Sequence, residues 1–131
     1  MAKIISILKI IFHISVSSLI ILSLFPGSLL GLLIHGDVSK QPHLIDNPFV
    51  GISINHFISF FLVSILGLWL YLKNENFQKL FYGLLFLSAI LEAFQFIIPN
   101  RAFQLHDLIG NLLGVLAAYF LVKIYLLLNK K

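Results

Sequence analysis

Four long apolar runs, separated by short polar stretches, dominate the pattern of residues along this chain. Each run holds roughly the 20 residues that a helix needs to cross the hydrocarbon core of a bilayer. Proline or polar residues end the runs, as at Pro26, at the sequence KNEN of residues 73–76 and at Pro99. The pattern predicts an all-α integral membrane bundle of four transmembrane helices, at residues 4–25, 56–72, 77–98 and 105–128.

The composition supports a membrane protein and leaves no room for a separate soluble domain. The chain has 131 residues, of which 60% are hydrophobic and 11% charged, and its mean hydropathy is +1.02. Four spanning helices and their connections use nearly all of this length, so we expect a single domain over residues 1–131. The first run is longer than the apolar core of a signal peptide and lacks an Ala-x-Ala-like site, so we expect it to be retained. The chain has no cysteine, which excludes disulfides and thiolate metal sites.

The basic residues predict the orientation of the bundle. They stand singly between apolar runs and give a net charge of +4, a pattern that argues against a nucleic-acid partner. With the N-terminus in the cytoplasm, seven of the nine basic residues lie inside, and only Lys40 and Arg101 lie outside. We therefore predict a multi-pass protein of the cell membrane with both termini in the cytoplasm. Residues 35–55 and the turn near Pro99 would form its outer face.

Polar side chains are concentrated near the predicted turn between the last two helices. Glu92 and Gln95 are three residues apart and share one helix face, and Asp107 and Asn111 are four apart and share another. The short turn makes the two helices antiparallel neighbours, so Glu92 and Asn111 would both lie about 10 to 12 Å below it. The sequence therefore predicts a polar cluster between these helices.

Two further residues complete a predicted outward-facing pocket. His56 begins the second predicted helix and can point toward the cluster, and Arg101 lies in the turn. Arg101 is the permanent cation near the two buried carboxylates, and we expect it to pair with Asp107 or Gln95 at the rim. Small residues at Gly110, Gly114 and Ala118 recur every four positions, so we expect close packing of the last two helices along that face. The predicted binding residues are His56, Glu92, Gln95, Arg101, Asp107 and Asn111.

Each of these residues also has a simpler interpretation. Asn111 and Gln95 are of the kind that join helices by hydrogen bonds, whereas buried carboxylates at Glu92 and Asp107 are more typical of a functional site. His106 points about 100° away from Asp107 on a helix, so this adjacent pair is not a preformed metal clamp. The sequence predicts neither a metal site nor a cofactor.

The order and spacing of the polar residues resemble the signature of the VanZ-like family of small bacterial membrane proteins. The resemblance covers residues 56–122, and Gln104, Phe60 and Ala118 depart from the family pattern. It implies a place in the bacterial cell envelope and an effect on sensitivity to the glycopeptide teicoplanin. The residues that carry it are His56, Glu92-x-x-Gln95, Pro99-x-Arg101 and Asp107-x-x-x-Asn111-x-x-Gly114.

Two functional hypotheses from different classes follow. In the first, a non-enzymatic envelope protein binds a lipid-linked precursor or a lipophilic glycopeptide at the outer leaflet. In the second, a membrane-embedded enzyme acts on a lipid-linked or phosphate-bearing substrate, with Glu92 and Asp107 as candidate catalytic acid and base and Arg101 as an anion anchor. Passage of ions is the weakest alternative, because the inner halves of the last three helices have almost no polar residues.

Overall fold

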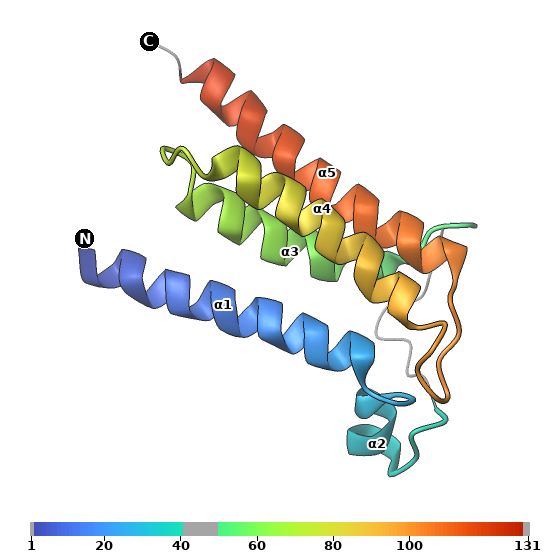
Figure 1. Ribbon diagram of the computed structural model, residues 1–131. Helices are drawn as coiled ribbons and strands as arrows, with labels where there is room; N and C mark the ends of the chain where they lie inside the picture. The colour runs from blue at the N-terminus through green and yellow to red at the C-terminus, as the bar shows by residue number, and fades with distance from the viewer. Residues whose placement is uncertain (1, 41–49, 130–131) are drawn as a thin grey trace.

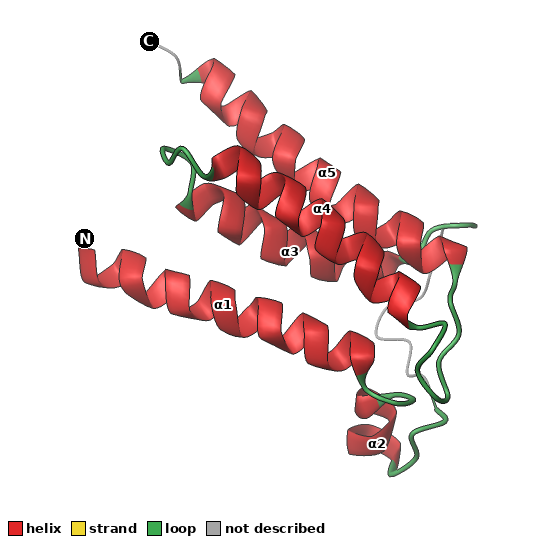
Figure 2. Ribbon diagram, in the orientation of Figure 1, coloured by secondary structure: helices red, strands yellow, loops and turns green. Residues whose placement is uncertain are grey.

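The computed structural model describes residues 2–40 and 50–129, and these contain five α-helices and no strand (Figures 1 and 2). The predicted all-α membrane bundle is confirmed. Helices α1, α4 and α5 are long and apolar enough to span a membrane, and α3 is a shorter apolar helix. The helices are α1 (Ala2–Leu24), α2 (Leu29–His35), α3 (Ile54–Leu70), α4 (Phe77–Phe94) and α5 (Leu105–Leu128).

Helices α3, α4 and α5 run side by side and enclose the core (Figure 1). The most extensive contact joins α3 to α5, where Leu68 and Val115 are wholly buried. Helix α1 lies at the edge of this group, and only 6% of its spanning segment is buried. Most of α1 is therefore free to face lipid.

The glycines of α5 pack against α3, and not against α4 as we expected from the short turn. A Cβ atom on Gly110 would lie 2.5 Å from the backbone oxygen of Ser53, and one on Gly114 would lie 2.5 Å from the backbone oxygen of Phe57. Small residues allow two helix backbones to approach this closely. Ala118, the third small residue of this face, is wholly buried in the core.

Near its middle, helix α1 packs against the bundle through Phe12. The ring of Phe12, which is 4% exposed, lies directly over Gly67 of α3, where a Cβ atom would collide with it. The Phe12 ring also packs edge-on against Tyr71 at the end of α3. Gly67 thus provides the space into which α1 docks.

The short helix α2 was not predicted, although its end signals are present in the sequence. The side chain of Ser28 accepts a hydrogen bond from the backbone N–H of Gly31, which caps the start of the helix. Gly36 ends it with φ of 66°, a left-handed conformation that suits glycine. The expected outer connection from residue 35 to residue 55 falls partly at residues 41–49, outside the described residues.

Helix α4 ends at Phe94, four residues before the predicted end at residue 98. The next amides donate three residues back, as in a 3₁₀ turn: Gln95 N–H donates to the Glu92 carbonyl and Phe96 N–H to the Ala93 carbonyl. Pro99 explains the early end, because its ring would clash with the carbonyl of Gln95 in a continuing helix. The chain from residue 95 to residue 104 therefore folds as a loop over the end of the bundle.

The start of α1 and the end of α5 lie at the same end of the bundle (Figure 1). Helix α2 and the loop of residues 95–104 lie at the opposite end. This arrangement places the predicted site residues far from the start of α1 and the end of α5. That the termini face the cytoplasm stays a prediction.

Candidate functional site

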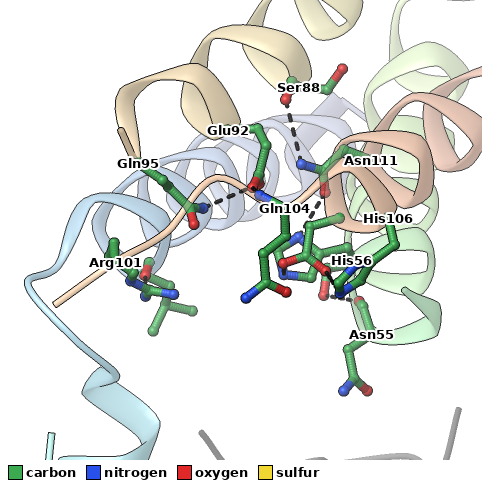
Figure 3. A network of polar contacts seen from close by, with 12 residues as sticks. Asn55, His56, Ser88, Glu92, Gln95, Arg101, Gln104, His106 and Asn111 are labelled. Carbon is green, nitrogen blue, oxygen red and sulfur yellow. Dashed lines mark hydrogen bonds and ion pairs between the residues drawn. The ribbon is translucent and has the colours of Figure 1, made fainter. Parts of the chain in front are cut away.

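Glu92 is the most deeply buried member of the polar cluster. Its side chain is wholly buried, and its two carboxylate oxygens accept separate hydrogen bonds (Figure 3). The backbone N–H of Gln104 donates to Oε1 at 3.0 Å, and Nε2 of Gln95 donates to Oε2 at 3.2 Å. Glu92 thus fastens both ends of the loop of residues 95–104 onto α4.

Asn111 connects three helices with one side chain. Its Nδ2 donates to the backbone oxygen of Ser88 on α4 at 3.4 Å, and its Oδ1 lies 2.9 Å from Nδ1 of His56 on α3 (Figure 3). Since the Ser88 carbonyl can only accept, the NH₂ group of Asn111 faces Ser88 and its oxygen faces His56. His56 therefore carries a proton on Nδ1 and presents Nε2 to the other side.

Asp107 lies beside that second nitrogen. Its Oδ2 is 3.5 Å from Nε2 of His56, and its Oδ1 is 3.5 Å from Nε2 of His106. The contact with His106 differs from our expectation, because the side-chain torsions bring the imidazole of this half-exposed neighbour back toward Asp107. Asp107 is thus flanked by two imidazoles at the start of α5.

Arg101 does not pair with a carboxylate in the part of the chain that the structure describes. Its Nη2 donates to the backbone oxygen of Leu22 at 2.6 Å, and its Nε donates to that of Phe25 at 3.2 Å. These carbonyls lie at the end of α1, where helix carbonyls lack partners within the helix. Burial lowers the pKa of Arg101, whereas the charges of Glu92 and Asp107 act in the opposite direction. Arg101 therefore holds the end of α1 against the loop. We had expected it to pair with Asp107 or Gln95 instead.

A cavity of about 250 Å³ opens at this end of the bundle. Its walls come from the end of α1, the start of α2, the start of α3 and the loop that leads into α5. Of the six predicted site residues, Glu92 and Asn111 are not among those that line the cavity and lie behind its wall. The other four line it: His56, Gln95, Arg101 and Asp107.

The backbone groups of the site could not be predicted from the sequence. Four backbone groups each hold a predicted side chain in place: the N–H of Gln104 and the carbonyls of Ser88, Leu22 and Phe25. Backbone groups are present at every residue, so the sequence carries no mark of which of them will serve. His106 was expected to point away from Asp107, because neighbouring residues on a helix are about 100° apart, but helix geometry alone does not fix a side-chain torsion.

Three side chains of the cluster offer metal-ligand atoms close together. One ligand atom from each of His56, Glu92 and Asp107 lies within 4.8 Å of the others. The side chains come from α3, α4 and α5. They form no metal-binding sequence motif, because such a motif relies on spacing within one segment.

These features define a class of protein: a polytopic α-helical membrane protein with a polar cavity at one end of its bundle. The chain belongs to the VanZ-like family, since the family model described as VanZ/LLP1 matches residues 5–127. The resemblance seen at residues 56–122 is thus confirmed, and the match also covers most of α1, where we had found no family motif. Searches of curated proteins and of solved structures found no match.

Proposed function

We propose that this protein binds a lipid-linked molecule of the bacterial cell envelope, with the polar headgroup in the cavity and the apolar chain between α1 and α3. The observation that carries the proposal is that two spaces adjoin each other. The polar cavity and a groove of about 340 Å³ between α1 and α3 share three lining residues, Leu19, Leu22 and Ser59. A molecule whose apolar chain lies in the groove would therefore have its headgroup beside the cavity.

The groove has the chemistry of a site for an alkyl or isoprenoid chain. Leucine, isoleucine and valine side chains make most of its walls, among them Ile14, Leu62 and Val63. Its Ser59 hydroxyl donates to the backbone oxygen of Asn55 at 2.8 Å, so this donor is already satisfied. An apolar chain in this groove would leave no unpaired donor behind at Ser59.

The cavity has the chemistry of a headgroup site. Its lining includes the amides of Gln95 and Gln104, the imidazole of His56 and the guanidinium of Arg101. An arginine has five N–H donors, and two of its nitrogens already bind carbonyls, so N–H groups remain for a phosphate or hydroxyl oxygen. These donors favour a polar headgroup that carries oxygen acceptors.

The family suggests the biological context of the proposal. A lipophilic glycopeptide such as teicoplanin, like a lipid-linked cell-wall precursor, combines a polar part with an apolar part. Binding of either at the outer leaflet would change sensitivity to the antibiotic. The predicted orientation supports this, because it places the cavity on the outer face.

Catalysis on the same substrate is the alternative function. The pair formed by Asp107 and His56 at the cavity wall supports it, since a carboxylate beside an imidazole is a common acid–base arrangement. Glu92 suits a catalytic role less well, because both of its oxygens accept hydrogen bonds behind that wall. Asp107→Asn should then abolish turnover of a headgroup while binding persists.

Photolabelling tests the binding proposal. The protein is reconstituted in vesicles with a phosphatidylglycerol that carries a diazirine in its acyl chain, and labelled peptides are located by mass spectrometry. We expect labels in α1 and α3 at the groove, and competition by teicoplanin or a polyprenyl phosphate. Ser18→Phe should block the groove, whereas Ser17→Phe, at an exposed neighbour that does not line the groove, should leave labelling unchanged.

Two results would overturn the binding proposal. One is labelling spread evenly over all lipid-facing helices, and the other is equal labelling of the Ser18 and Ser17 variants. Competition by one compound and not the other would identify the headgroup class.

A further inference from the structure

Three helices bring three potential metal ligands to one point at the wall of the cavity. His56 of α3, Glu92 of α4 and Asp107 of α5 each place one ligand atom within 4.8 Å of the other two. In Figure 3 the side chains of His56 and Glu92 extend from different helices into the same network. The three residues lie on different helices, so the tertiary fold brings them together and no sequence motif does.

The hydrogen bonds around His56 turn a lone pair toward Asp107. The Asn111 oxygen accepts the proton on Nδ1, at 2.9 Å, so Nε2 of a neutral His56 is an acceptor. This nitrogen faces Oδ2 of Asp107, another acceptor, at 3.5 Å. Two acceptors that face each other need a cation between them, either a proton or a metal ion.

The charges of the cluster favour a doubly charged cation. Glu92 and Asp107 carry two negative charges when both are ionised, and the donors that contact Glu92 are a neutral amide side chain and a backbone amide. In the described residues, no lysine or arginine nitrogen lies within 4 Å of either carboxylate. A protonated His56 offsets one of these two charges, whereas a divalent ion offsets both. Uncompensated charge at this depth is costly.

We propose that His56, Glu92 and Asp107 bind a divalent transition-metal ion of the Zn²⁺ class. An imidazole nitrogen with two carboxylates is a ligand set that suits such an ion better than Mg²⁺. Ligand atoms around tetrahedral zinc are about 3.4 Å apart, so the ion would draw the three side chains together. His56 and Asp107 retain some exposure and can rotate toward the ion.

The surroundings match those of a site that accepts a further ligand. His56 and Asp107 line the cavity, so a fourth coordination position would face the bound headgroup or water. The oxygen of Asn111 accepts from Nδ1 of His56 and so fixes the tautomer of this imidazole. Metal-binding histidines commonly have such a hydrogen-bond partner at the ring nitrogen that does not bind the metal. An ion bound by the three side chains would be accessible from the cavity.

Zinc titration of the full chain in detergent tests the proposal. The protein is stripped with a chelator, and bound Zn²⁺ is measured by competition with a chromogenic chelator. We expect one tightly bound ion per chain and much weaker binding of Mg²⁺. His56→Gln, Glu92→Gln and Asp107→Asn should each weaken binding beyond the roughly 10- to 100-fold loss typical of outer-shell changes.

Matched variants at exposed positions control for binding at the surface. His35→Gln and Glu75→Gln, both at exposed residues outside the cluster, should leave the affinity unchanged. If either lowers it as strongly as the cluster variants do, or if the chain binds no stoichiometric Zn²⁺, the proposal is wrong. No lipid is present in this experiment, so its outcome is separate from that of the photolabelling.

X-ray absorption of the unaltered protein provides a measurement that needs no variant. With one equivalent of Zn²⁺, the spectrum should show nitrogen and oxygen ligands with outer-shell scattering from one imidazole. Scattering from two or more imidazoles would mean that other histidines hold the ion, and the site as proposed would be excluded.

Discussion

Nδ1 of His56 and Oδ1 of Asn111 lie 2.9 Å apart, and this contact joins α3 to α5 behind the wall of the cavity. The side-chain NH₂ group of Asn111 also donates to the Ser88 carbonyl of α4. One side chain therefore positions the imidazole and also holds three helices in register. Asn111 thus joins helices by hydrogen bonds, which is the simpler of the interpretations that the sequence allowed.

Replacing Asn111 with alanine should destabilise the bundle. The change leaves the Nδ1 proton of His56 without its partner and removes the contact to Ser88, at a cost of about 1 to 3 kcal/mol. Unfolding of the detergent-solubilised protein, followed by circular dichroism, measures the difference. Asn129→Ala is the control, because Asn129 is exposed and, among the described residues, bonds only to Tyr125 at the end of α5. Equal stability of the two variants would contradict the role of Asn111.

The glycine face of α5 predicts a second stability difference. A Cβ atom at Gly114 would lie 2.5 Å from the Phe57 oxygen and 2.9 Å from the Phe61 nitrogen, both in the backbone of α3. Gly114→Ala should therefore push α5 away from α3 and cost about 1 to 3 kcal/mol. A Cβ atom at Gly83 of α4 meets no atom of residues 2–40 or 50–129 within 4 Å, so Gly83→Ala should be neutral or stabilise by up to about 1 kcal/mol. Thermal unfolding that fails to separate the two variants would rule out the close contact.

The orientation of the bundle can be tested with single cysteines, because the chain has none of its own. Ala102→Cys, in the loop at the cavity end, should react in intact cells with a reagent that cannot cross the membrane. Glu75→Cys, in the turn between α3 and α4, should react only after the cells are broken. The reverse result would place the cavity on the cytoplasmic side and would remove the argument for an outer-leaflet ligand.

Side chains that share a helix face were predictable from the sequence, and backbone partners were not. The spacing of Glu92 and Gln95 predicted their association, and the hydrogen bond between them forms even though Gln95 lies beyond the end of α4. The equal depth of Glu92 and Asn111 likewise follows from the helical rise and a short turn. The backbone N–H of Gln104, which donates to Glu92, had no comparable signal in the sequence.

The choice between neighbouring helices also lay beyond the sequence. Gly110 and Gly114 marked a face of close packing, but a short turn suggested α4 as the partner and the structure gives α3. Three helices in contact offer two candidate partners for any face, and only the tertiary arrangement decides between them. For the same reason the position of α1, through Phe12 over Gly67, could not be predicted.

Arg101 provides the last prediction, because the structure gives it a role other than the expected one. The sequence suggested a cation that neutralises a carboxylate or anchors an anion. The structure shows donation to the carbonyls of Leu22 and Phe25, which ties the end of α1 to the loop. Arg101 lines the cavity as well, so a loss of function in a variant would not by itself distinguish positioning of α1 from binding of a headgroup.

Hydrogen exchange of the end of α1 separates the two roles. Arg101→Gln should speed exchange at residues 21–28 by roughly 10- to 100-fold, because a hydrogen bond from a charged group contributes about 1.5 to 3 kcal/mol. Lys40→Gln, at an exposed basic residue, should leave that exchange unchanged. If Arg101→Gln impairs lipid photolabelling while exchange at α1 stays slow, its guanidinium acts on the headgroup directly. If exchange rises and labelling of the groove falls together, Arg101 acts by holding α1 in place, since the groove exists only while α1 lies against α3.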